Sequence, residues 1–234
     1  MTSFAAPRLK RPFVAELWRR VQRERALGAL FDLGRQRSGG LRVARVYAFL
    51  VFLGYAVAIA LSRGAGQRSL IHGFMQAALG SLSWVVGALA ALGAAEALAQ
   101  QANRGALAAL ARQRGFSSAA LLRARTWAAA SCITRLVALP ALSLVLVGVA
   151  RGGSLPWALS VAPAVVVYAA LLGVSLALLA HLAAELAPRH PRALLFVLVL
   201  GPFLLSQAFP ALPNVPDLAS SLLRRLLANG ARLS

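Results

Sequence analysis

Five long apolar runs, separated by charged segments, constrain the fold of this sequence more than any other feature. An α-helix rises about 1.5 Å per residue, so about 20 apolar residues cross the roughly 30 Å hydrocarbon core of a bilayer. Of the 234 residues, 59% are hydrophobic and only 13% are charged, which excludes an ordinary soluble domain. We predict an all-α integral membrane protein with about five transmembrane helices, at residues 43–61, 70–95, 127–150, 157–180 and 193–209.

The basic residues are distributed as in a membrane protein. Lys and Arg number 25 against six Asp and Glu, for a formal net charge of +19, but they gather in the segments between the apolar runs. This segregation is typical of membrane proteins rather than of nucleic-acid-binding proteins. The sequence therefore predicts the lipid bilayer, and no nucleic acid, among the partners of this chain.

The same basic residues predict an orientation in the membrane. Short loops rich in Lys and Arg stay in the cytoplasm. Basic residues number 11 in residues 1–45, five in 98–125 and two in 182–192, against two in 62–69, one in 151–156 and three in 210–234. We expect the first three segments on the cytoplasmic side, in a multi-pass protein of the bacterial cytoplasmic (inner) membrane whose N-terminus is cytoplasmic.

Amphipathic segments flank the predicted transmembrane domain of residues 43–209. In the cytoplasmic segment 1–42, residues 12–31 carry apolar side chains near helical spacing with arginines between them. This pattern predicts a helix on the inner membrane surface, either as an anchor or with a role in transport. The tail, 210–234, has a second amphipathic pattern that is too short and too charged to cross, so we place it on the outer surface.

Small residues and one arginine stand out inside the spans. Gly73, Gly80, Gly87 and Ala94 recur every seven residues and form a stripe along one face of the second span, where another helix can approach closely. That helix belongs either to the same chain or to a second copy. Arg135 lies in the third span, about four residues below the inner interface if the hydrocarbon begins near Ser131, and is either an anchor that snorkels to that interface or a polar contact in a translocation path.

The cytoplasmic segment 98–125 is too long for a turn and too short for a soluble domain. It predicts two short helices broken at Gly115, with Ser117 or Ser118 as the cap of the second helix and Phe116 as an exposed aromatic anchor. A rigid projection of this kind fits a groove on a soluble partner.

This order of elements resembles the type-2 exporter permeases of the ATP-binding cassette (ABC) transporters. The match is carried by Arg104-Gly105-Ala106-Leu107 and by Ser117 followed by Leu121-Leu122-Arg123-Ala124-Arg125. The family usually has an acidic residue where this chain has Gln101, and six spans rather than five. The resemblance implies a cytoplasmic coupling helix between spans 2 and 3 that docks on an ATPase subunit through Arg104, Gly105, Leu107, Leu110, Phe116, Ser117 and Leu121.

The resemblance also implies a function, that of the membrane-spanning permease subunit of an ABC exporter. The chain would form the translocation path with a second permease copy or paralogue, and ATP and Mg would bind to a separate P-loop ATPase subunit. The phosphate-binding motif G-x-x-x-x-G-K-[ST] requires a lysine, and the only lysine, Lys10, is followed by Arg11. We therefore expect no enzyme activity and no cofactor in this chain, and the apolar spans favour a hydrophobic or amphipathic cargo.

Two other classes of function remain open, a secondary transporter or channel and an intramembrane enzyme or membrane assembly scaffold. His181 and Glu185 lie four residues apart near the inner end of the fourth span, with His190 beyond them, but the zinc motif H-E-x-x-H is absent. His72 and Gln76 form a polar patch that an interhelical hydrogen bond explains better than substrate contact. No serine lies in G-x-S-x-G, so we predict neither catalytic residues nor a metal site.

Overall fold

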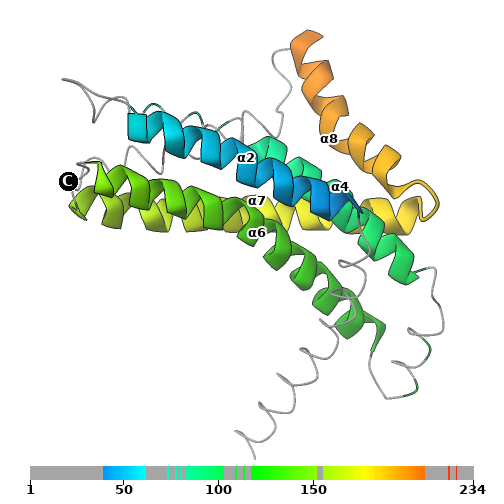
Figure 1. Ribbon diagram of the computed structural model, residues 1–234. Coiled ribbons are helices and arrows are strands. Elements are labelled where there is room, and N and C mark those ends of the chain that lie inside the picture. Colours follow the sequence, from blue (N-terminus) through cyan, green and yellow to red (C-terminus); the bar gives the residue numbers. More distant parts are fainter. Residues whose placement is uncertain are drawn as a thin grey trace, which may run out of the picture.

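A computed structural model describes residues 39–61, 83–102, 117–151 and 155–208, together with a few isolated positions. Within these residues every regular element is a helix, and Figure 1 shows how the helices are arranged. Their bounds are α2 (Gly39–Leu61), α4 (Ser83–Ala102), α6 (Ser118–Ala150), α7 (Leu155–Leu186) and α8 (Pro191–Ala208). The amphipathic helix predicted at 12–31, and all but isolated positions of the segment 103–116 and of the tail, lie outside the described residues.

Four of these helices, α2, α4, α6 and α7, are long and apolar enough to cross a membrane. The prediction of an all-helical, multi-pass chain is confirmed at this level. The fifth apolar run also forms a helix, but α8 has only 18 residues, and its apolar stretch, Pro191–Pro202, is shorter than the other four. The chain thus has four long candidate spans and one short apolar helix in its described part.

Several helices run beyond the apolar runs that predict them. α6 begins nine residues before Trp127, and α7 continues six residues past Ala180. A helix propagates as long as each added residue forms a backbone hydrogen bond, whereas an apolar run reports only the thickness of the hydrocarbon. α7 ends just before Pro188, because a proline disfavours the helical conformation of the residue before it.

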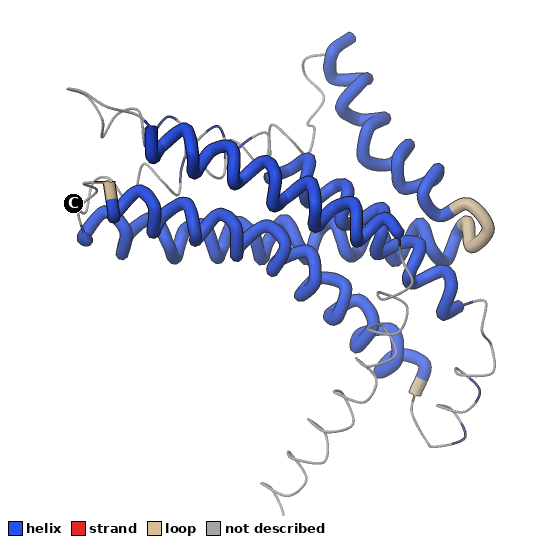
Figure 2. The backbone as a smooth tube through the Cα atoms, viewed as in Figure 1, coloured by secondary structure: helices blue, strands red, loops and turns tan. Residues whose placement is uncertain are grey.

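Successive helices run in opposite directions, and α2, α4, α7 and α6 form a ring in which each helix contacts the next. α8 packs on α4 and α7 at the outside of this ring. Figure 2 shows the short loop of residues 187–190 that joins α7 to α8 at one end of the bundle. We call this end, where α2, α6 and α8 begin and where α4 and α7 finish, the charged end.

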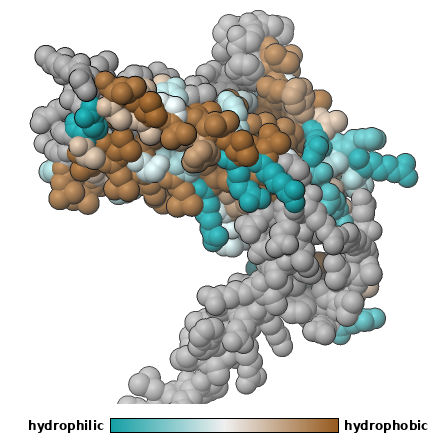
Figure 3. All heavy atoms as spheres, in the orientation of Figure 1, coloured by the Kyte–Doolittle hydropathy of each residue, from teal (hydrophilic) through white to brown (hydrophobic). Residues whose placement is uncertain are grey.

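The surface between the two ends is apolar. Brown, hydrophobic atoms cover most of the length of the bundle in Figure 3, and hydrophilic atoms gather toward the charged end. Large side chains such as Phe49 on α2, Leu146 on α6 and Leu178 on α7 are more than half exposed. A soluble monomer rarely exposes so much contiguous apolar surface, whereas a lipid-facing surface requires it.

Small residues bring the helix backbones together. α2 meets α4 at Gly40 and Gly93, where a Cβ atom on Gly40 would lie 2.9 Å from the Cα of Gly93. α6 meets α7 at Thr134 and Gly173, where a Cβ atom on Gly173 would collide with the Thr134 hydroxyl. That hydroxyl donates a 3.3 Å hydrogen bond to the carbonyl of Ala169 on α7. Helices in lipid associate through such close packing and interhelical hydrogen bonds.

The stripe of small residues predicted in the second span divides into two parts. Ala94 is fully buried, and a Cβ atom on Gly87 would lie 3.0 Å from Leu176 of α7. A Cβ atom on Gly73 or Gly80 would meet nothing within 4 Å. Gly87 therefore packs against a helix of its own chain.

Candidate functional site at the charged end of the bundle

The charged end contains the two points where the segment 103–116 joins the bundle. Of the residues to which the family resemblance assigns a docking role, Ser117 and Leu121 are described, whereas Arg104, Gly105, Leu107, Leu110 and Phe116 lie outside the described residues. This segment leaves the bundle from the end of α4 and returns at the start of α6.

Ser117 is the cap of α6. Its side-chain oxygen accepts a 3.1 Å hydrogen bond from the backbone nitrogen of Ala120, which satisfies one of the donors that the first helical turn leaves without a partner. Of the two serines that the sequence offers for this role, the structure selects Ser117. The helix that follows is not a separate short helix, as the sequence suggested, because it continues without a break to Ala150.

Arg125 links α6 to α4 near the start of α6 and the end of α4. Its side chain is buried, and its Nη2 donates a 2.7 Å hydrogen bond to the backbone carbonyl of Leu98. Hydrogen bonds from a charged donor are about twice as strong as neutral ones. The two helices that carry the segment 103–116 are therefore fastened to each other close to the points where it joins them.

His181 and Glu185 of α7 extend this cluster. The His181 Nε2 and the Glu185 carboxylate are 3.9 Å apart, and Glu185 acts electrostatically on Arg125 as well. The Arg125 Nε and the His181 Nδ1 are buried, and no residue in the described part of the chain accepts a hydrogen bond from either. Within the described residues no group of three His, Cys, Asp or Glu side chains is placed to hold a metal ion, and His190 does not join the pair.

A second ion pair joins α8 to α4. The Arg192 guanidinium contacts the Glu96 carboxylate, although 96 residues separate the two in the sequence. Nothing in the sequence indicates that these two residues meet. The pair fastens the first turn of α8 beside the last turns of α4, so polar contacts at the charged end link α4 to both α6 and α8.

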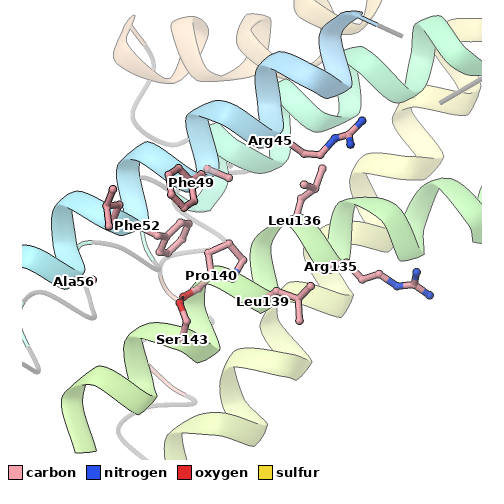
Figure 4. Close-up of a pocket in the computed structure, with 11 residues that line it drawn as sticks. Arg45, Phe49, Phe52, Ala56, Arg135, Leu136, Leu139, Pro140 and Ser143 are labelled. Atoms are coloured by element: carbon pink, nitrogen blue, oxygen red, sulfur yellow. Dashed lines mark hydrogen bonds between the residues drawn. The ribbon is translucent and has the colours of Figure 1, made fainter. Parts of the chain in front are cut away.

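An open groove lies between α2 and α6 on another face of the bundle. Its volume is about 370 Å³, and Figure 4 shows Phe52 of α2 and Pro140 of α6 facing each other across it. Arg45 of α2 and Arg135 of α6 lie at one end of this groove, on its two sides, and Ala56 and Ser143 lie toward the other end. Its lining residues are Arg45, Ala48, Phe49, Phe52, Leu53, Ala56, Arg135, Leu136, Leu139, Pro140 and Ser143.

Arg135 is exposed on the outside of the bundle and does not lie among the buried residues between the helices. Sequence reasoning found Arg135 by its position within an apolar run but missed its neighbour Arg45 as part of a site. It also missed the buried role of Arg125, because an arginine in a basic segment outside an apolar run normally indicates a solvent-exposed position. His72 and Gln76 lie outside the described residues.

Comparison of the chain with protein-family models, with curated proteins and with solved structures gives no match. What this chain does must therefore be argued from the charged end, from the groove and from the sequence.

Proposed function

We propose that this chain is the membrane-spanning permease subunit of an ABC exporter. In this proposal the charged end faces the cytoplasm, because short segments rich in arginine remain on that side. The four long helices and α8 cross the inner membrane. A P-loop ATPase subunit, which binds ATP and Mg, docks on the segment 103–116, and a second permease copy or paralogue completes the path for a hydrophobic or amphipathic cargo.

The observation that carries the proposal is the hydrogen bond from Arg125 to the carbonyl of Leu98. A docking segment can transmit force only if the helices at its two ends move together. Arg125 supplies that link between α4 and α6, and the neighbouring pair of His181 and Glu185 brings α7 into the same cluster. A displacement of the segment would therefore act on three membrane helices at once, which is what coupling to an external motor requires.

The path of α6 supports the same function. The helix has 33 residues, about 50 Å, although about 20 residues are enough to cross the hydrocarbon. Its first turns extend away from the bundle on the side of the segment 103–116 (Figure 1). A single continuous helix thus connects the proposed docking segment to the far end of the membrane domain.

The experiment that tests the proposal is affinity purification of the full chain from membranes of its own host, with Mg·ATP hydrolysis measured in the eluate. We expect hydrolysis to co-purify with the chain and to be carried by a separate polypeptide that contains a P-loop. Gly105→Asp and Phe116→Asp each place a charge in the docking segment, so both should abolish the co-purifying hydrolysis while membrane insertion is retained. His190→Asp, in the exposed loop between α7 and α8, is the matched control and should retain it.

Other outcomes contradict the proposal in distinguishable ways. A chain that purifies without an ATPase and drives uptake into liposomes in response to an ion gradient is a secondary transporter or channel. A chain that acts alone on a lipid or peptide, with the activity abolished by His181→Ala, is a membrane enzyme. If ATP hydrolysis co-purifies with the two Asp variants to the same extent as with the unmodified chain, the ATPase contacts another part of the chain.

A further inference from the structure

The groove between α2 and α6 has apolar walls and a basic end. Phe49, Phe52 and Leu53 of α2 face Leu136, Leu139 and Pro140 of α6 along its length, and the only charged residues that line it are Arg45 and Arg135. From Arg45 to Ala56 the groove follows 11 residues of α2, about 16 Å at 1.5 Å per residue. Its shape suits a ligand with an anionic group at one end and a hydrocarbon chain behind it.

The two arginines lie at the same depth in the membrane domain. At the end opposite the charged end, Arg151 donates a hydrogen bond to the carbonyl of Ala60, which aligns α2 with α6. Arg45 lies 15 residues from Ala60 and Arg135 lies 16 residues from Arg151, or about 22 and 24 Å along the helices. In a hydrocarbon core of about 30 Å, both side chains then start about 6 to 8 Å inside the interface of the charged end and reach the headgroups by snorkelling.

The charge at this end of the groove is not neutralised by the described part of the chain. Arg45 donates from Nε to the carbonyl of Leu41 in its own helix, at 3.3 Å, and no carboxylate of a described residue pairs with it or with Arg135. The two acidic residues of the described helices are engaged elsewhere, Glu96 with Arg192 and Glu185 with His181. A second copy of these helices would therefore bring no unengaged carboxylate to the groove, whereas anionic lipids supply a phosphate at this depth.

We propose that this groove binds one anionic phospholipid of the surrounding bilayer, with its phosphate at the end lined by Arg45 and Arg135 and an acyl chain along Phe52 and Pro140. Basic pockets between transmembrane helices recognise anionic headgroups by charge, and two arginines provide two such contacts. The apolar walls accept the acyl chain without an unsatisfied polar group, because the Ser143 hydroxyl donates to the carbonyl of Pro140 in its own helix. The site does not depend on the transport function proposed above.

Native mass spectrometry of the full chain in neutral detergent tests the proposal, with phosphatidylglycerol and phosphatidylcholine of identical acyl chains as probes. We expect one phosphatidylglycerol to bind in preference to phosphatidylcholine. Each arginine near a membrane surface contributes about 1 kcal/mol to anionic lipid binding, so Arg45→Gln combined with Arg135→Gln should weaken phosphatidylglycerol binding about 30-fold. Phosphatidylcholine binding should not change.

Two matched controls separate this site from general effects of charge and size. Arg123→Gln combined with Arg189→Gln removes the same charge from exposed positions outside the groove and should leave the lipid preference unchanged. Ala56→Phe fills the groove while keeping both arginines, so it should weaken the binding of both lipids. Val57→Phe, the next residue of α2 and outside the lining, should not.

Three results would overturn the proposal. The first is equal binding of the two lipids by the unmodified chain. The second is the same loss of phosphatidylglycerol from both double variants, which would indicate nonspecific attraction to total charge. The third is a dimer in which Phe49→Cys forms a cross-link between copies and no lipid is retained, which would show that a second copy occupies the groove.

Discussion

The α6–α7 and α2–α6 interfaces share one helix and differ in how closely that helix approaches its partner. Where α6 meets α7, Gly173 allows the two backbones to touch and Thr134 donates a hydrogen bond across the contact. Where α6 meets α2, the rings of Phe49 and Phe52 and the bend-prone Pro140 leave an open groove. The size of the residues at a crossing therefore decides whether two helices in lipid close on each other or leave room for a ligand.

Arginines on the same helix show the same difference. Arg125 is buried in the closed part of the bundle and has a protein acceptor, the carbonyl of Leu98. Arg135 lies ten residues further along α6, is exposed, and points out of the open groove (Figure 4). Arg125 joins two helices, whereas Arg135 faces the surroundings of the bundle. Substitution of Arg125 should therefore lower stability, and substitution of Arg135 should affect lipid binding instead.

The largest effect is expected at the closed interface, for Gly173→Leu. A Cβ atom there would lie 3.0 Å from the carbonyl oxygen of Ala130 and 3.1 Å from the backbone nitrogen of Thr134, and backbone atoms cannot yield. Overpacking of this kind should cost about 3 kcal/mol of unfolding free energy, measured by titration with a denaturing detergent in mixed micelles. Gly54→Leu, where a Cβ atom meets nothing within 4 Å, should change it by less than about 0.5 kcal/mol. Equal tolerance of both substitutions would contradict the packing described for α6 and α7.

A smaller effect is expected for Arg125→Gln. Loss of a hydrogen bond from a charged donor should lower the unfolding free energy by about 2 kcal/mol in the same titration. Arg135→Gln, at the exposed position, should lower it by less than about 0.5 kcal/mol. If Arg135→Gln lowers the unfolding free energy as much as Arg125→Gln does, the distinction between a helix-joining and an exposed arginine is wrong.

The smallest effect is expected for Thr134→Val, which removes the hydroxyl that joins α6 to α7 but keeps the shape of the side chain. Interhelical hydrogen bonds in membrane proteins average about 0.6 kcal/mol, so a loss of that size is expected, with recovery in Thr134→Ser. Ser143→Ala removes a hydroxyl in the open groove that bonds only to its own helix, and it should have no measurable effect. If Ser143→Ala lowers the unfolding free energy more than Thr134→Val does, the assignment of α6–α7 as the closed interface and α2–α6 as the open one is wrong.

The sequence predicted the helical class and the presence of long apolar helices because both depend on local apolar content. The bounds were less accurate where the chain leaves the hydrocarbon: α4 continues to Ala102 and α6 begins at Ser118, since alanine-rich and arginine-rich segments sustain a helix without being apolar enough to mark a span. α8 (Pro191–Ala208) follows its apolar run of 193–209 to within two residues, although it is shorter than the other four helices.

The sites were harder to predict than the spans because they depend on which helices become neighbours. Arg135 could be placed near an interface from its position in the third run, but the groove beside it exists only because α2 packs against α6. Arg192 and Glu96 form an ion pair, yet nothing local in the sequence indicates that residues so far apart meet. Sequence periodicity reports the face of a helix and not the identity of its partner.

Pro140 divides α6 into arms of unequal length. From Ser118 to Pro140 the helix runs 22 residues, about 33 Å, and from Pro140 to Ala150 it runs 10 residues, about 15 Å. A proline inside a helix removes one backbone hydrogen bond and makes that point the easiest place to bend. For the same bending angle at Pro140, the tip of the longer arm, at Ser118, is therefore displaced about twice as far as the tip of the shorter arm, at Ala150.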